Sequence, residues 1–160
     1  MSPAYTLLTT EAGYRQGYDT ILGRAQHHIL IFDRDLAALR LDEKARLEAL
    51  VNFLQTDPVR RIRVVLHDPG PLERDAPRLL QLIFRFSHLI DVRQSPDNLR
   101  HLADTHVLAD ERHGLRRFHV EQPRSALILD DRAYIHPWRQ RFEELWELSH
   151  PCLRINTTGL

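Results

Sequence analysis

Side chains that could bind a metal ion or carry acid–base chemistry are most concentrated between residues 101 and 113. The group consists of His101, Asp104, His106, Asp110 and His113. Imidazole and carboxylate ligands suit zinc and other transition metals. The spacing matches no fixed metal motif, however, and a strand would place His106 and Asp110 on one face. We therefore expect no metal or other cofactor, and we keep His101, His106 and Asp110 as candidates for ligand binding.

A second candidate lies at the end of a predicted strand. Arg61–His67 contains a short apolar, β-branched run, and Pro69-Gly70-Pro71 closes it with a turn signal, which indicates a buried strand. His67 and Asp68 lie where this strand ends, at the edge where open α/β sheets usually bind ligands. Two interpretations stay open, a ligand-binding pair or a turn in which Asp68 caps backbone amides.

Arginines form the third candidate group. Arg112, Arg116 and Arg117 could bind a phosphate, because guanidinium groups form paired hydrogen bonds to phosphate oxygens. The alternative is an exposed hairpin with solvated charges. Of the 22 lysines and arginines, only Lys44 is a lysine, so a mechanism that needs a lysine has one candidate. The sequence contains no Gly-rich phosphate loop and no Gly-x-Ser-x-Gly nucleophile motif.

Composition limits the class of protein. The 160 residues fit one domain over 1–160 that buries roughly 70% of its unfolded surface. Lys+Arg and Asp+Glu are both 22, so the charge does not indicate nucleic acid or a membrane surface as partner. A single cysteine, Cys152, can form neither an internal disulfide nor a cysteine-based zinc site. Because we find no membrane-spanning run and no signal-peptide core, we expect a cytoplasmic protein.

The elements that must position these residues alternate between strand and helix patterns. We expect strands over Tyr5–Leu8, His28–Phe32, Arg61–His67, Leu89–Val92, Thr105–Ala109, Leu115–Val120 and Ser125–Leu129, with an edge strand over Cys152–Ile155. We expect helices from Glu11 to about residues 23–25, from a cap at Asp42 to Asp57-Pro58, from Asp75–Pro77 to Phe86, and from about Pro137 to Leu148.

This order predicts one α/β domain with a mixed, mainly parallel central sheet flanked by helices. The strands His28–Phe32 and Arg61–His67 should be parallel neighbours, because a right-handed helical crossover of this length joins strands that lie close together. The helix after Asp42 should cover one face of the sheet, and the helix that contains Trp146 should pack on the sheet as well.

The order of elements resembles one half of the phospholipase D superfamily over roughly residues 15–150. Phe142, Trp146 and Ser149 match the closing Phe-x-x-x-Trp-x-x-Ser helix of those domains, and Val107–Asp110 enters a hairpin as in those domains. The chain is most similar to an uncharacterised proteobacterial group of phospholipase D-like domains. The stretches that carry this closer similarity are His67-Asp68-Pro69, Leu79-Leu80 and Pro151–Ile155. The resemblance implies a single phospholipase D-like sandwich.

Active members of the superfamily carry His-x-Lys with an aspartate five residues beyond the lysine. The histidine attacks phosphorus and the lysine neutralises phosphate charge. The resemblance gives the aspartate role to Asp110, the histidine role to Ala103 and the lysine role to Thr105. Lys44 lies on a predicted helix and cannot replace the lysine. Because alanine and threonine cannot do this chemistry, the resemblance implies a catalytically inactive domain that acts as a binding or interaction module.

Several partners fit such a module, namely a second copy of the chain, another protein or a phosphorylated ligand. Single-half members of the superfamily pair two chains so that their half-sites face each other, which implies a homodimer. Some members of the proteobacterial group follow an acyltransferase domain in longer chains, so an acyltransferase is a candidate partner. The alternative function is a phosphodiesterase or nuclease-like hydrolase with a rebuilt site that uses His67, His106 and Asp110.

Overall fold

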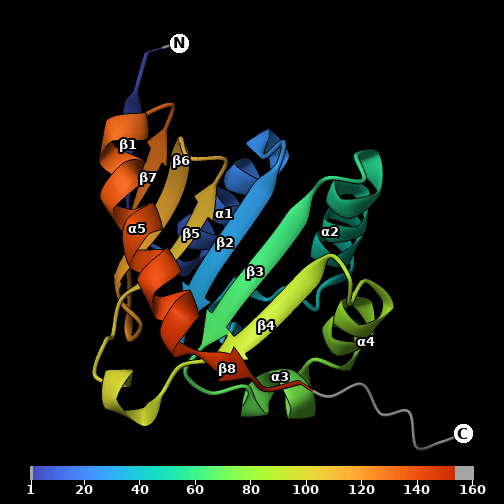
Figure 1. The fold of residues 1–160 in the computed structure, drawn as a ribbon. Helices are drawn as coiled ribbons and strands as arrows, with labels where there is room; N and C mark the ends of the chain where they lie inside the picture. Colours follow the sequence, from blue (N-terminus) through green and yellow to red (C-terminus); the bar gives the residue numbers. More distant parts are fainter. Residues whose placement is uncertain (1, 154–160) are drawn as a thin grey trace, which may run out of the picture.

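The computed structural model describes residues 2–153 as a single α/β domain built on one eight-stranded sheet (Figure 1). The strands are β1 (Ala4–Leu8), β2 (His28–Asp33), β3 (Arg61–Leu66), β4 (Ile90–Gln94), β5 (Thr105–Ala109), β6 (His113–His119), β7 (Gln122–Leu129) and β8 (His150–Pro151). The helices are α1 (Glu11–Arg24), α2 (Lys44–Thr56), α3 (Gly70–Asp75), α4 (Pro77–Arg85) and α5 (Arg132–Leu148), with short 3₁₀ helices η1 (Ala37–Leu39) and η2 (Asp97–Leu99). None of the helices in residues 2–153 combines the length and the apolar character needed to span a membrane.

The sheet has the order β1-β7-β6-β5-β2-β3-β4-β8. The expected parallel pairing of β2 with β3 is confirmed, and β4 joins β3 in the same direction. The prediction of a mainly parallel sheet is wrong, because the other five strand pairings are antiparallel. Short loops connect β5, β6 and β7, and such connections join antiparallel neighbours, whereas only helical crossovers produce parallel ones.

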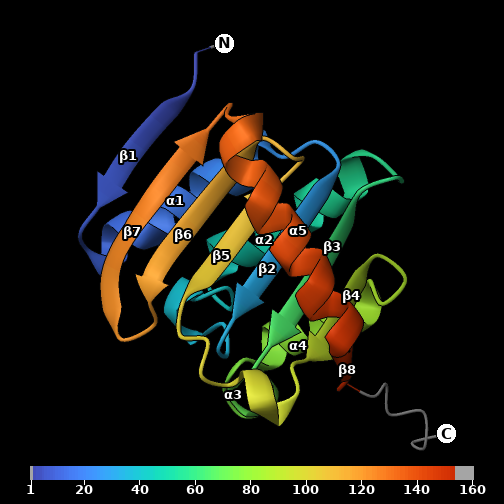
Figure 2. The same ribbon diagram turned by 60° about the vertical axis from the view of Figure 1, so that its left-hand side comes forward.

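Two helical layers enclose the sheet. Helices α1, α2 and α4 cover one face, called the α1 face below, and α5 crosses the other, the α5 face (Figure 2). Along β2 the side chains alternate between the layers. Ile29 and Ile31 join the core under α1 and α2, and Leu30 and Phe32 join the core under α5. This double burial explains why β2 is a continuous apolar run in the sequence.

Two expected helix starts need correction. The Asp42 carboxylate does not cap α2, because it accepts a hydrogen bond from the backbone N–H of Leu79 (2.7 Å) in the first turn of α4. Helix α5 begins at Arg132, because the Asp131 carboxylate caps its first turn at Tyr134 N (3.0 Å). Pro137 therefore lies inside the helix rather than at its start.

Two short elements also differ from expectation. The Pro69-Gly70-Pro71 turn leads directly into α3. Strand β8 pairs with β4 at His150–Pro151, two residues before the expected edge strand, of which residues 154 and 155 lie outside the described part of the chain.

Candidate functional site

The carboxyl ends of β2, β3 and β4 meet the start of β5 and the end of β6 at one edge of the sheet. Because successive side chains of a strand point to opposite faces, neighbouring candidates separate here. Thr105 faces α1 while His106 packs under α5. Their partners on β6, Arg117 and Arg116, separate in the same way. The edge therefore carries two distinct groups of side chains.

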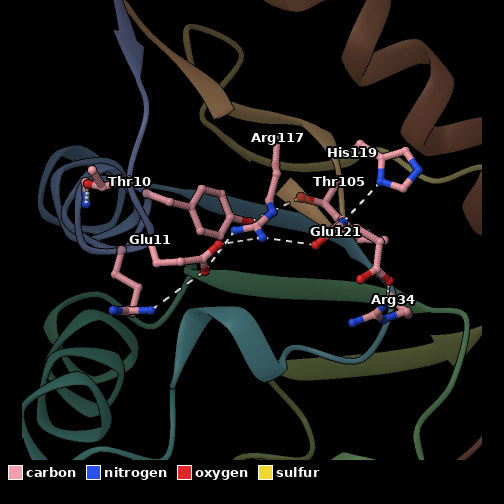
Figure 3. Close-up of polar contacts among 11 residues, drawn as sticks. Thr10, Glu11, Arg34, Thr105, Arg117, His119 and Glu121 are labelled. Carbon is pink, nitrogen blue, oxygen red and sulfur yellow. Dashed lines mark hydrogen bonds and ion pairs between the residues drawn. The ribbon is translucent and has the colours of Figure 1, made fainter. Parts of the chain in front are cut away.

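The group on the α1 face is called the Arg117 cluster and consists of Glu11, Tyr14, Asp33, Thr105 and Arg117. The Arg117 guanidinium donates to both carboxylate oxygens of Glu11 (2.7 and 3.2 Å) and to the carbonyl oxygen of Val120 (3.0 Å), as Figure 3 shows. Its carbon Cζ lies 4.8 Å from the centre of the Tyr14 ring. The Tyr14 hydroxyl in turn lies 3.2 Å from the Thr105 hydroxyl. Thr105, at the position that the superfamily resemblance assigns to lysine, thus lies beside the Tyr14 hydroxyl, and Arg117 is the cation of this cluster.

Two members of the Arg117 cluster, Glu11 and Arg117, form an ion pair, and Asp33 is a second, buried carboxyl group. The hydrogen bond from Arg117 holds the pKa of Glu11 below its ordinary value. Burial raises the pKa of Asp33 to about 6, and the neighbouring backbone N–H groups of Arg34 and Asp35 offset only part of this rise. The cavity lined by Tyr14, Asp33, Thr105 and Arg117, together with residues of the following loops, measures about 10 Å³, enough for one water molecule at most.

The group on the α5 face is aromatic and centres on His106. The imidazole has no exposed surface, and its ring centre lies 5.5 to 6.3 Å from the ring centres of Phe32, Trp138 and Phe142. Neither ring nitrogen has a hydrogen-bond partner within residues 2–153. Burial lowers the pKa of His106 to about 3, so the ring is neutral at pH 7. His106 is a core residue, far from the solvent that a nucleophile of this kind would need.

The His67 side chain, at the end of β3, forms hydrogen bonds to the segment between β4 and β5. Its Nε2–H donates to the carbonyl oxygen of Leu102 (2.8 Å), which leaves Nδ1 to accept from the Ser95 hydroxyl. Burial lowers the pKa of His67. Asp68 accepts from the N–H of Gly70 (2.9 Å), which is the turn-capping role that was one of its two interpretations.

Arg116 and Arg117 lie on opposite faces of the sheet, so they do not form one patch with each other. Arg116 stacks on the Trp138 ring, with Cζ 3.6 Å from its centre, and donates to the Tyr134 hydroxyl (2.8 Å). Nearby, Arg141 forms a bidentate ion pair with Asp104 (2.6 and 2.8 Å). The alternation of strand β6 separates the two arginines by the thickness of the sheet.

Asp110 lies at the opposite end of β5 from Thr105 and His106. Its carboxylate accepts the backbone N–H groups of Gln26, His27 and His28 at 2.7 to 3.0 Å, and this ties the loop after α1 to the hairpin. The structure therefore does not bring Asp110 together with His67 and His106, although both histidine rings contact Phe32.

The remaining members of the sequence group are also dispersed. His101 is exposed in the loop before β5, and His113 accepts at Nδ1 from the N–H of Asp130 (3.1 Å). Across residues 2–153 no three His, Cys, Asp or Glu side chains are arranged to hold a metal ion.

Sequence reasoning missed Glu11, Tyr14 and Asp33. Asp33 had a usable signal, because it directly follows an apolar strand just as His67 does. Glu11 showed only as the acidic first residue of a helix, and Tyr14 showed only as part of that helix. Their contact with Arg117 joins segments more than 100 residues apart, which no local pattern encodes.

Solved structures share this architecture at low sequence identity. Nuc of Salmonella typhimurium, a phospholipase D family member, superposes with a TM-score of 0.68 at 12% identity, covering 96% of this chain and all of Nuc. NucT from Helicobacter pylori gives 0.62 at 9% identity, with 94% and 100% covered. TrmBL2, an archaeal chromatin protein with a novel mode of DNA binding, gives 0.66 at 14% identity. That match covers 92% of this chain but only 54% of TrmBL2.

These likenesses establish a phospholipase D-like fold. No curated protein matches the sequence significantly. Residues 11–157 match the model of a family described as a domain of unknown function, DUF7931. The chain is therefore a member of the DUF7931 family with a phospholipase D-like fold.

Proposed function

We propose that this domain has no phospholipase D activity and acts as a protein-interaction module. The observation that carries the proposal is the Arg117 cluster. The cation beside Thr105 already binds the Glu11 carboxylate through two hydrogen bonds, and about 10 Å³ of space remains. A phosphodiester would need both a free cation and a cavity of its own size.

The chemistry argues in the same direction. Superfamily hydrolysis requires a histidine nucleophile and a cation already placed against the phosphate oxygens, because the transition state develops charge that preorganised groups must stabilise. Loss of one such group typically lowers the rate by factors of hundreds. Ala103 and Thr105 supply neither group. His106, next in sequence, is directed into the aromatic core under α5.

A phosphorylated ligand is less well supported than a protein partner. Arg117 is neutralised by Glu11, and Arg116 is stacked on Trp138. Arg112, the third candidate, forms an ion pair with Asp130 (3.2 Å), so all three arginines are engaged in internal contacts. We favour a protein partner, either a second copy of the chain or an acyltransferase of the kind joined to some similar domains.

Two measurements test this proposal. Purified chain incubated with a chromogenic phosphodiester, with divalent metal ions and with chelator, should give no rate above the blank. Turnover that disappears in His106→Ala would contradict the inactivity and would support a rebuilt site. Sedimentation analysis of the chain, alone and mixed with an acyltransferase domain, tests the interaction. A chain that stays monomeric and forms no complex with the acyltransferase domain would contradict the proposed interaction role.

A further inference from the structure

Strand β1 is a sheet edge with an unused side. All five of its residues pair with β7, in a regular register from Ala4 opposite Leu129 to Leu8 opposite Ser125. Its other side has no neighbour in residues 2–153, since β1 is the first strand of the sheet order (Figure 2). Half of the backbone N–H and C=O groups of such an edge strand point away from the sheet.

Sheet edges in monomeric proteins usually carry a feature that prevents pairing, such as a charge, a proline, a bulge or a very short strand. The opposite edge has two of these features, because β8 is only two residues long and one of them is Pro151. Strand β1 has none. Its sequence, Ala-Tyr-Thr-Leu-Leu, is uncharged, and its pairing with β7 contains no bulge.

The exposed side chains of β1 are apolar on one face. Tyr5 is 58% exposed and Leu7 is 44% exposed, and both lie on the α5 face, opposite the buried residues Ile128 and Ala126 of β7. The centre of the Tyr5 ring lies 6.2 Å from that of the Tyr134 ring of α5. An uncharged strand that combines free backbone groups with exposed apolar side chains is suited to adding one more strand.

We propose that the added strand is β1 of a second copy of this chain, paired antiparallel about Thr6. This is the one register of two β1 strands in which all five residues of each find a partner. Tyr5 then lies opposite Leu7 of the partner subunit on the α5 face, and the two Thr6 residues face each other across the two-fold axis. Aromatic–aliphatic and Thr–Thr cross-strand pairs are favourable, and neither strand brings a charge that would repel the other.

The proposed contact is symmetric, so each subunit uses its β1 edge once. A two-fold axis perpendicular to the sheet joins the two sheets edge to edge and leaves no further free β1, so the assembly stops at a C2 dimer. This contact differs from the pairing of half-sites that the superfamily resemblance implies, because it is made by the β1 edge of the sheet. This inference rests on the proposed function as an interaction module. It identifies a second copy of the chain as the partner and β1 as the contact surface.

Two double variants test both the surface and the register. Light scattering or sedimentation should give twice the chain mass for the wild type. Tyr5→Lys with Leu7→Lys sets lysine opposite lysine at both symmetry-related pairs, and should weaken dimerisation about tenfold or more. Tyr5→Lys with Leu7→Glu changes the same two side chains but sets lysine opposite glutamate, and should keep the dimer and make it salt-sensitive. Leu148→Lys, which charges a 62% exposed leucine on α5, is the matched control and should leave the dimer unchanged.

Each other outcome overturns the inference. A monomeric wild type would do so, as would a dimer that survives the lysine–lysine variant or a lysine–glutamate variant as weak as the lysine–lysine one. Circular dichroism checks that both variants are folded, and the edge position of the substitutions favours this. These results are separable from the loss of catalysis, because phosphodiester turnover would overturn the proposed inactivity without touching the dimer surface.

Discussion

The two faces of the sheet at its candidate edge use the same strands for opposite purposes. On the α1 face, Thr105 and Arg117 belong to a polar cluster in which Arg117 is paired with Glu11. On the α5 face their chain neighbours, His106 and Arg116, are packed against aromatic rings. Residues that are adjacent in the sequence therefore share a strand but not a site. Closely spaced polar residues on a strand are consequently weak indicators of a common function.

The comparison extends to pH. Burial acts on a base on one face and on an acid on the other, so the two faces should respond to acid with opposite sign. A buried base becomes charged as the pH falls, and this destabilises the folded protein. A buried acid becomes charged as the pH rises, and this destabilises the folded protein in the opposite direction of pH. His106 and Asp33 are these two groups.

The largest effect is expected for His106→Leu in acid. The folded pKa of His106 is lowered from 6.5 to about 3, so its contribution is complete above pH 6.5 and is lost as the pH falls. At pH 4.5 the wild type should have lost about 3 kcal/mol through this residue, a loss that leucine cannot show. Urea denaturation at pH 7 and pH 4.5 measures the difference, with His101→Leu as the exposed control. Equal acid sensitivity of wild type and His106→Leu would contradict a buried neutral imidazole.

Asp33→Asn should produce the opposite trend on the α1 face. The folded pKa is raised from 3.8 to about 6, so the penalty is absent below about pH 4 and grows as the pH rises through 6. Relative to the asparagine variant, the wild type should lose about 2–3 kcal/mol over that window. Thermal denaturation of both proteins across this pH range provides the comparison, and parallel profiles would show that Asp33 is not buried as described.

Arg117→Met should destabilise the domain by about 2 kcal/mol at pH 7. The side chain is 5% exposed, and its removal leaves the carbonyl of Val120 without its donor and Glu11 without its counter-charge. The exposed Arg124 on the neighbouring strand β7 gives the matched control, since Arg124→Met should change stability by less than about 0.5 kcal/mol. Similar effects of the two substitutions in chemical denaturation would mean that the cluster contributes little.

Much of the fold could be predicted because its signals are local. The apolar run of Arg61–His67 and the turn signal after it predicted the buried strand β3, and the first helix was expected from Glu11, where α1 begins. The start of α5 could not be placed, since Pro137 resembled a first-turn proline although Asp131 caps the helix. The Arg117 cluster could not be predicted either, because its ion pair joins β6 to the first residue of α1, far away in the sequence.

The smallest expected effect separates the two halves of that ion pair. Glu11 is 43% exposed, so solvent screens its attraction to Arg117 and Glu11→Gln should cost only about 0.5–1 kcal/mol at pH 7. The hydrogen bond from Arg117 lowers the pKa of Glu11, so its contribution is present above the ordinary carboxyl pKa and is lost as the pH falls through the lowered value. In the Arg117→Met background the same substitution should cost almost nothing, because the partner is already gone. A double-mutant cycle by urea denaturation measures the difference. If Glu11→Gln still destabilises the Arg117→Met variant, the stabilisation comes from Arg15, which also lies within 4 Å of Glu11. That result would argue against Glu11 as the residue that neutralises Arg117 beside Thr105.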